Sequence, residues 1–591
     1  MPQFKAPLAD FQFLLQDWLR IDEHYQDIGA LDFDYELVSE VIAQGAKFAE
    51  EVVAPLNREG DEQGCTLIEG SVTTPHGFAQ AYQEYVANGW NAMLGNPDYD
   101  GQDLPYSAAV PVHEMLNAAN LSWRLTTMLT ESAVLAVDKH ASQSLKDQYL
   151  AKIISGEWTG TMNLTEPHAG TDLALLNTKA VANDDGSYAI TGNKIFITGG
   201  DHDWTSNIVH LVLARLPDAP AGVKGISLFL VPKFLLDDNG QPSSANKVGV
   251  GSIEKKMGIK ASPTCVMNYD GAKGWLVGEE NNGLACMFTM MNDARFQVGL
   301  QGLGAAEASF QGALSYARER LQSRAPQGVQ QKNEKADAII HQPDVRKMIL
   351  TQKALTEGCR ALSLVYAQQM DVEKYCNDDR KHSAKLVLAF LTPICKGFMT
   401  DMATEVTNLG IQVYGGHGYV REWGMEQLVR DTRIAQLYEG TNGIQAADLI
   451  GRKLTRDGGK MMTATFALLT DLGERISDTT RKQSALDLLL EWQQVSKGLL
   501  STTESQPQPE DIAGAATDYL HYSAYVILGV LWQSMADTAS TSANDFIKQG
   551  KAKTADFYIK RILPRKDVHK SVILGSSTDL LAHADQEFDY V

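Results

Sequence analysis

The chain has 591 residues, which is too many for a single hydrophobic core, so we expect roughly three or four domains. An apolar content of 44% with 21% charged residues is ordinary for a globular protein. The 52 basic and 73 acidic residues give a net charge of −21, and no long basic run interrupts the acidic surplus. Nucleic acid and acidic membranes are therefore disfavoured as partners.

The six cysteines are scattered, without a Cys-x-x-Cys pair or a histidine spacing suited to zinc. This pattern favours buried, reduced thiols and predicts no metal site. The N-terminus lacks the basic and apolar regions of a secretory signal, and no uninterrupted apolar run reaches the roughly 18 residues of a membrane span. We therefore expect a cytoplasmic enzyme with no membrane span.

The first part of the chain has helical periodicity, at 34–53, 77–88 and 111–149, with a loop rich in turn formers at 95–102. It predicts an N-terminal helical domain at 1–157. Met128, Leu129 and Leu135 are expected in its core, with the lining of an apolar ligand pocket as the alternative.

From Trp158 the pattern changes to short β-branched or alternating runs, which predict a β domain at 158–280. Its expected strands are 188–191, 194–198, 208–214 and 226–231. Strands and helices do not alternate, so a doubly wound parallel sheet is disfavoured. Neither glycine cluster has the context of a dinucleotide fingerprint: the one at 249–251 has no following helix, and the one at 302–304 lies inside a helical pattern, where small residues let helices approach closely.

Long helical patterns then run to the end of the chain. Those at 293–324, 343–372, 383–409 and 442–453 predict a C-terminal helix-bundle domain at 281–455. Helices at 461–474, 484–500 and 513–535, with a linker at 505–509, predict a further helical domain at 456–591, the C-terminal extension. The expected fold class is α+β.

The stretch LYEGTNGIQ at 437–445 is the leading candidate for chemistry. It places Glu439 between an aromatic residue and a glycine, after a basic segment and before a helix. Burial raises the pKa of a carboxylate toward the working pH, and glycine gives the backbone room to bring the side chain against a substrate. A general base is the functional interpretation, and an ordinary turn is the alternative.

Three motifs, in order, resemble the acyl-CoA dehydrogenase family: TMNLTEPHAGTD at 161–172, KIFITGG at 194–200, and QVYGGHGY at 412–419 followed by YEGT at 438–441. The resemblance covers roughly residues 35 to 455. It implies an N-terminal helical domain, a central β domain and a long-helix bundle.

The same resemblance implies an FAD-dependent oxidation of an acyl-CoA thioester to its trans-2-enoyl form, as in fatty-acid β-oxidation. Glu439 would take the C2 proton while FAD accepts the C3 hydride. The backbone N–H of Glu439 and a ribityl hydroxyl of the flavin would donate hydrogen bonds to the thioester carbonyl.

Family correspondence assigns the binding residues. The residues implied to bind FAD within one subunit are Met162, Leu164, Thr165, Gly170, Thr171, Phe196, Thr198 and Thr441. The neighbouring subunit would contribute Arg320, Gln412 and Gly416 to the same FAD. The residues implied to bind the substrate are Thr171, Arg295, Tyr438 and Gly440. Without the resemblance, Met162 and Phe196 would be read as β-domain core. Arg320 is followed by LQSR rather than by the usual threonine/phenylalanine-glycine, so Arg324 is a candidate to share its role. The alternative for Arg295 is that it binds no substrate and is simply a solvated or ion-paired side chain.

The C-terminal extension and the segment MGIKASPTC at 257–265 resemble longer bacterial members, which include 3-methylthiopropionyl-CoA dehydrogenases and some fatty-acyl-CoA dehydrogenases. Because the added helices would cover the face used for tetramers in short members, we expect a homodimer. An electron-transfer flavoprotein is the expected acceptor.

Other functions on the same scaffold stay open at this point. They are an acyl-CoA oxidase, a DNA-associated alkylation-response flavoprotein, which the charge of −21 disfavours, and a scaffold without catalysis. Short, sulfur-containing and long acyl chains all remain open.

Overall fold

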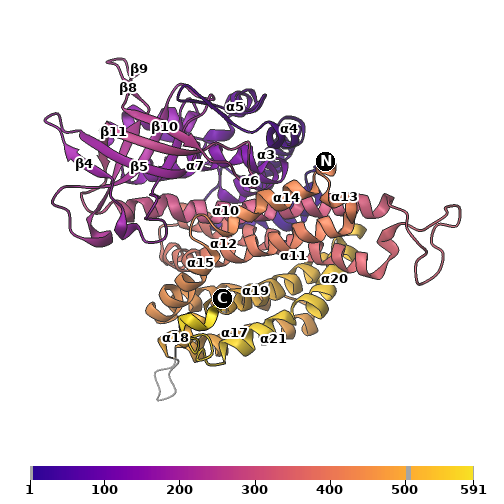
Figure 1. Ribbon diagram of the computed structural model, residues 1–591. Helices are drawn as coiled ribbons and strands as arrows, with labels where there is room; N and C mark the ends of the chain where they lie inside the picture. The colour runs from indigo at the N-terminus through magenta and orange to yellow at the C-terminus, as the bar shows by residue number, and fades with distance from the viewer. Residues whose placement is uncertain (1–3, 501–507, 590–591) are drawn as a thin grey trace. The chain divides into compact units, whose positions relative to one another are not determined.

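The computed structural model describes residues 4–500 and 508–589, which form two compact units (Figure 1). The mixed unit contains residues 47–105 and 119–297. The helical unit contains residues up to 46, 106–118 and those from 298 onward. Each unit is thus assembled from segments that are distant in sequence.

A seven-stranded sheet organises the mixed unit. Its order is β10-β11-β5-β4-β6-β3, and β7 pairs with both β11 and β6, so five of its strands close on themselves. The strands are β3 (Thr159–Asn163), β4 (Lys179–Ala182), β5 (Tyr188–Thr198), β6 (Ile208–Arg215), β7 (Ile226–Pro232), β10 (Val248–Ile253) and β11 (Thr264–Val277), with a separate pair β8 (Phe234–Leu236) and β9 (Pro242–Ala245). Most pairs are antiparallel, as the lack of strand–helix alternation predicts.

The sheet encloses the core of this unit. Residues Ile190, Ile197, Val212, Phe229 and Cys265 are buried together. On β5 buried and exposed positions roughly alternate, whereas β6 and β7 are buried along nearly their whole length. Their continuous apolar runs follow from burial on both faces.

A hairpin interrupts the region that we predicted to be wholly helical. Strands β1 (Thr66–Ile68) and β2 (Ser71–Thr73) are joined by Glu69 and Gly70, both at positive φ (51° and 80°). Two consecutive positive φ values are the hallmark of the tight turn that matches strand twist. The Glu-Gly pair between β-branched residues was the signal that we missed.

The other helices of the mixed unit are α4 (Leu56–Gln63), α5 (Phe78–Ala87), α7 (Leu121–His140), α8 (Gln143–Leu145) and α9 (Ala151–Ser155). The predicted helix 111–149 is therefore broken. Asn120 has extended backbone geometry and caps α7, its side chain accepting a hydrogen bond from the backbone N–H of Trp123 (3.1 Å).

Long helices dominate the helical unit. The longest are α10 (Gly283–Glu319, which begins in the mixed unit), α11 (Pro343–Tyr375) and α12 (Asp379–Tyr414). The shorter helices before the C-terminal extension include α1 (Leu8–Gln12), α2 (Ile21–Ile28), α3 (Tyr35–Phe48), α6 (Tyr106–Ala119), α13 (Gly416–Tyr419), α14 (Met425–Thr432) and α15 (Asn442–Asp448). The structure starts α10 ten residues earlier than predicted, because the apolar segment before Asp293 lacks the polar face on which the periodicity argument relies.

The glycines at 299–304 do let helices approach closely, as predicted. A Cβ atom on Gly299 or on Gly302 would lie 2.8 Å from a carbonyl oxygen of α12, that of Cys395 or of Met399. Glycine is therefore required where α10 crosses α12.

The C-terminal extension forms α16 (Lys460–Glu474), α17 (Thr479–Leu499), α18 (Pro509–Gly514), α19 (Ala516–Ala539), α20 (Asp545–Phe557) and α21 (Arg565–Ile573). Helix α19 is its buried centre and contacts α12, α17 and α21 (Figure 1). Of the predicted linker 505–509, residues 505–507 lie outside the described residues, and α18 begins at Pro509.

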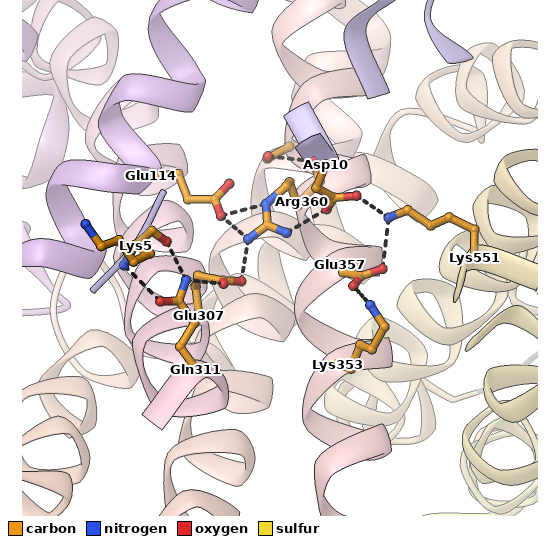
Figure 2. A network of polar contacts seen from close by, with 10 residues as sticks. Lys5, Asp10, Glu114, Glu307, Gln311, Lys353, Glu357, Arg360 and Lys551 are labelled. Carbon is orange, nitrogen blue, oxygen red and sulfur yellow. Dashed lines mark hydrogen bonds and ion pairs between the residues drawn. The ribbon is translucent and has the colours of Figure 1, made fainter. Parts of the chain in front are cut away.

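A buried ionic network joins the N-terminal segment to the rest of the helical unit (Figure 2). Arg360 of α11, 1% exposed, binds carboxylates of Glu114 (2.6 Å), Glu307 (2.5 Å) and Asp10 (2.7 Å). Burial raises the pKa of Glu114 to about 7, although Arg360 opposes this shift.

Lys551 of α20 extends the network to the C-terminal extension. It pairs with Asp10 and with Glu357, the latter at 2.8 Å, and Lys353 pairs with Glu357 (Figure 2). Burial favours the neutral form of Asp10, but Lys551 and Arg360 outweigh it and hold the pKa of that carboxyl below its usual range. The network thus holds three cations against four carboxylates, and Glu114 is the carboxylate most ready to take a proton.

Of the helices that the structure describes, α12 alone is long and apolar enough to cross a membrane by length and composition. Within its most apolar window, 83% is buried inside the protein, as in the core helix of a globular domain.

Candidate active site

The mixed unit carries one group of the predicted residues on two strands and the loop between them. Met162 lies on β3, Phe196 and Thr198 lie on β5, and Leu164 and Thr165 directly follow β3. The backbone N–H of Ile195 donates to the carbonyl of Thr165 (2.9 Å), which places the 164–166 segment beside β5. The fold therefore brings the first two motifs together.

Glu166 anchors this segment from inside. Its buried carboxylate accepts hydrogen bonds from the ammonium of Lys194 (2.8 Å), from the hydroxyl of Thr178 (2.6 Å) and from the backbone N–H groups of Asn177 and Thr178. Lys194, fully buried, also donates to the carbonyl of Leu164 (3.0 Å). Burial lowers the pKa of Lys194 to about 8, although the carboxylate of Glu166 opposes this shift. Burial alone would raise the pKa of Glu166, but Lys194 and the other donors outweigh it and hold that pKa below its usual value.

Phe196 is the least ordinary residue of the sheet. Its φ is 60°, and 60% of its surface is exposed. The register of β5 against β11 shifts here, so Ile195 and Phe196 together oppose Val266. A bulky residue held at positive φ and exposed to solvent costs folding free energy, which points to a role in binding rather than in the core.

The remaining predicted residues of this unit lie at its surface. Gly170 and Thr171 are exposed, after a turn closed by two 3.0 Å backbone hydrogen bonds between Glu166 and Ala169. Arg295 of α10 is half-buried, stacks over the ring of Phe288 (5.8 Å to the centroid) and donates to Asn292 (3.1 Å).

The helical unit carries the candidate catalytic stretch, 437–441, on a loop between two helical segments. Glu439 has φ 55° and Gly440 has φ 83°. The hydroxyl of Tyr438 donates to Gln301 of α10, and the side-chain amide of Gln445 donates to the carbonyl of Glu439 (2.9 Å). A glutamate held at positive φ by its neighbours is strained, which is characteristic of functional loops.

Lys396 of α12 holds the Glu439 loop through two hydrogen bonds. It is fully buried, and its ammonium donates to the carbonyl of Gly440 (2.7 Å) and to the amide oxygen of Asn442 (2.8 Å). Asn442 in turn donates to the carbonyl of Gly397 (3.0 Å) and to Thr400 (2.9 Å). The loop is therefore fixed to one side of α12.

Thr441 caps α15, its hydroxyl accepting a hydrogen bond from the N–H of Ile444 (3.3 Å). Glu439 thus lies two residues before the cap of this helix.

Arg320, Gln412 and Gly416 are exposed at one end of the helical unit. Arg320 follows α10 directly, and the hydroxyl of Tyr316, one turn earlier, bonds to His417 beside Gly416 (2.9 Å). Arg324 donates to the carbonyl of Gln331 (3.1 Å) and to Asp337 (3.3 Å). It therefore organises its own loop, so sharing the role of Arg320 would require it to give up these contacts.

Among residues 4–500 and 508–589, no group of three or more His, Cys, Asp or Glu side chains is placed to hold a metal ion. All six cysteines are free thiols, with Cys65 half-buried and the others buried.

The chain matches four family descriptions in succession: the acyl-CoA dehydrogenase N-terminal domain at 38–157, middle domain at 161–272 and C-terminal domain at 281–454, and an acetyl-CoA dehydrogenase C-terminal-like domain at 472–584. It is 40% identical to a 3-methylmercaptopropionyl-CoA dehydrogenase of Ruegeria pomeroyi, over 98% of this chain and 99% of the relative. The chain belongs to the acyl-CoA dehydrogenase family.

Solved structures share the fold of this chain. Caenorhabditis elegans ACDH-11, in complex with C11-CoA, is 20% identical, and the match covers 95% of this chain and 92% of ACDH-11 with a TM-score of 0.77. An acyl-CoA dehydrogenase of Bacillus anthracis complexed with FAD is 19% identical to this chain. That match covers 94% of this chain and 90% of the other, with a TM-score of 0.71. The predicted α+β fold, with its extra C-terminal helices, and the predicted assignment to a family of FAD-dependent oxidoreductases are confirmed.

Two groups that support the candidate site residues were missed in the sequence. They are the pair Glu166–Lys194 and the group of Lys396, Asp401 and Asn442 on and beside α12. A lysine inside a mostly apolar helical run, as at 387–399, was a usable signal, because a buried lysine requires acceptors nearby.

Proposed function

We propose that this acyl-CoA dehydrogenase oxidises an acyl-CoA thioester to the trans-2-enoyl thioester, with Glu439 as the base. The supporting observation is the strained Glu439, held at φ 55° by a loop that Lys396, Asn442 and Gln445 fix in place. Strain maintained by so many contacts is explained if the carboxylate must be aimed at one carbon atom.

Glu439 removes the proton from C2 of the substrate. Negative charge then develops on the thioester oxygen, and we propose that the backbone N–H of Glu439 donates a hydrogen bond to it. Tyr438 and Gly440 flank the acyl group, while Thr171 and Arg295 contact the CoA portion. Tyr438, Glu439 and Gly440 are half-buried, and we propose that the bound substrate excludes water from them, which would otherwise compete for the base.

The residues of the mixed unit fit FAD. Phe196 offers an exposed aromatic face, Met162 and Leu164 offer apolar contacts, and Thr165, Thr171 and Thr198 offer hydroxyl donors, with close backbone approach at Gly170. Thr441 completes the set within one subunit. FAD, when bound, accepts the hydride that leaves C3.

We further propose a homodimer in which Arg320, Gln412 and Gly416 of one protomer hold the FAD of its partner. The three residues are exposed at one end of the helical unit, where a neighbouring protomer can reach them. Light scattering of the purified protein should give a dimer, and a stable tetramer would contradict this arrangement.

The acyl group is proposed to be 3-methylmercaptopropionyl or a fatty acyl chain, because the 40% identical relative is named for the former. The acceptor is proposed to be an electron-transfer flavoprotein. A panel of acyl-CoA thioesters should bleach the flavin anaerobically, and slow reoxidation in air would separate a dehydrogenase from an oxidase.

The variant Glu439→Gln tests the central assignment. General-base catalysis contributes about 10²- to 10⁴-fold, so flavin reduction by substrate should slow by about that factor while flavin content and thioester binding persist. Glu474→Gln, at an exposed carboxylate of the C-terminal extension, is the control and should reduce flavin at the normal rate. If Glu439→Gln turned over at a substantial fraction of the wild-type rate, the base would be another residue.

A further inference from the structure

The Glu439 loop is clamped at both ends by one carboxylate. Asp401 of α12 accepts hydrogen bonds from the side-chain amide of Gln436 (2.6 Å), before Glu439, and from that of Asn442 (2.7 Å), after it. Both donors reach the same oxygen, Oδ1. The two ends of the catalytic loop therefore share one anchor.

The other oxygen of Asp401 is bound by the C-terminal extension. Oδ2 lies 2.9 Å from Nε2 of His521, on α19. An ionised carboxylate only accepts hydrogen bonds, so Nε2 carries the proton. Burial favours the neutral acid, but the hydrogen bonds from His521, Gln436 and Asn442 outweigh it and hold the pKa of Asp401 below its usual value.

His521 is itself held on two sides. Its ring meets Phe398 of α12 edge to face, with centroids 5.6 Å apart, and stacks on His569 of α21 at 5.2 Å. His569 is fixed in turn by a 2.8 Å contact with Asp518. The ring therefore has little freedom to turn away from Asp401.

We infer that His521 is a positioning residue for the reaction, acting through Asp401 on Gln436 and Asn442 and so on the carboxylate of Glu439. This inference rests on the proposed role of Glu439 as base. Without the donor from His521, Oδ2 of Asp401 turns to water and the shared anchor loosens. The C-terminal extension then has a part in catalysis as well as in packing.

The test compares His521→Leu, which removes the donor, with His521→Gln, whose amide nitrogen reaches about as far as Nε2. Small misplacements of a reacting group cost up to about 10²-fold, and we expect about 10-fold slower flavin reduction in single turnover for His521→Leu. The substrate concentration for half-saturation should not change, the isotope effect of C2-deuterated substrate should increase, and His521→Gln should recover most of the rate.

Hydrogen exchange supplies a readout that does not depend on activity. Amides of 436–442 should exchange faster in His521→Leu, and those of α17 should not. The matched control is Arg565→Gln, which removes the 2.8 Å ion pair between Arg565 and Glu405, another contact of the extension with α12, one turn beyond Asp401. It should leave both flavin reduction and loop exchange unchanged.

If His521→Leu reduced flavin at the normal rate and its amides at 436–442 exchanged normally, the inference would be overturned and the proposed function would stand. Flavin reduction slowed equally in Arg565→Gln would have the same consequence. If His521→Leu does not fold, Asp401→Asn reports on the same anchor, because its amide has one acceptor oxygen and cannot accept both from His521 and from the pair Gln436 and Asn442. Normal loop exchange in that variant also overturns the inference. Failure of the wild-type flavin to bleach with any acyl-CoA would instead contradict the proposed function.

Discussion

Each unit supports its functional loop with a fully buried lysine, but the two lysines have different partners. Lys194, in the mixed unit, binds the carboxylate of Glu166 and the carbonyl of Leu164. Lys396, in the helical unit, donates to the carbonyl of Gly440 and to the amide of Asn442. The first forms an ion pair that makes one strand segment rigid, whereas the second holds a turn through uncharged oxygens.

The difference matches what each loop is proposed to do. A cofactor that stays bound needs a rigid cradle, which a buried ion pair with several additional hydrogen bonds can provide. A base must approach and leave a carbon atom, so its support acts on the backbone and on neighbouring side chains. The variants below separate these roles.

The largest effect is expected for Lys194→Met. It leaves Glu166 as an uncompensated buried charge, and breaking such a pair costs about 3–5 kcal/mol. The melting temperature and the flavin content should both fall. In Lys194→Met combined with Glu166→Gln a substantial part of the stability should return, and a double variant no more stable than the single one would show that the ion pair is not the support.

The Arg360 network differs from the Glu166–Lys194 pair because it holds more carboxylates than cations. Burial raises the pKa of Glu114 to about 7 from an ordinary value of 4.5, so the folded state binds the extra proton. This proton stabilises the folded state fully below pH 4.5, and the stabilisation is lost as pH rises through about 7. Since each pKa unit corresponds to about 1.4 kcal/mol, the free energy of unfolding should fall by about 3 kcal/mol over this range.

Glu114→Gln should therefore flatten the fall in melting temperature between pH 5 and pH 8. Glu307→Gln, which removes another carboxylate from Arg360, is the control and should destabilise the protein without removing that slope. Equal slopes in wild type and Glu114→Gln would mean that a different group takes up the proton.

How much of this was visible in the sequence depends on the range of the interactions. Local patterns predicted the long helices, the glycines between α10 and α12, and the residues of the three motifs. The supports were hidden because Glu166 meets Lys194, and Asp401 meets His521, across long stretches of chain. No local periodicity encodes such pairings, whereas the Glu-Gly turn of the missed hairpin was a readable local signal.

Lys396→Met should have an intermediate effect. It removes two hydrogen bonds from a charged donor and leaves the carbonyl of Gly440 without that partner, at a cost of about 2 kcal/mol. Flavin content should stay normal, unlike in Lys194→Met, while flavin reduction by substrate slows. Lys385→Met, at an exposed lysine of the same helix, should behave as wild type. Loss of flavin in Lys396→Met would erase the distinction between the two lysines.

The smallest effect on stability is expected at Phe196, where strain and binding oppose each other. Glycine accepts a φ of 60° without strain, and Phe196 is 60% exposed, so Phe196→Gly should change stability by no more than about 1 kcal/mol. Aromatic contacts contribute about 1 kcal/mol each, so the dissociation constant of FAD should rise by roughly 5- to 10-fold. Phe196→Leu keeps apolar bulk and the strain, and should weaken FAD binding without the gain in backbone freedom. If Phe196→Gly bound FAD as tightly as wild type, the exposed ring at positive φ would need another explanation, and the rigid-cradle interpretation of the mixed unit would rest on Glu166 and Lys194 alone.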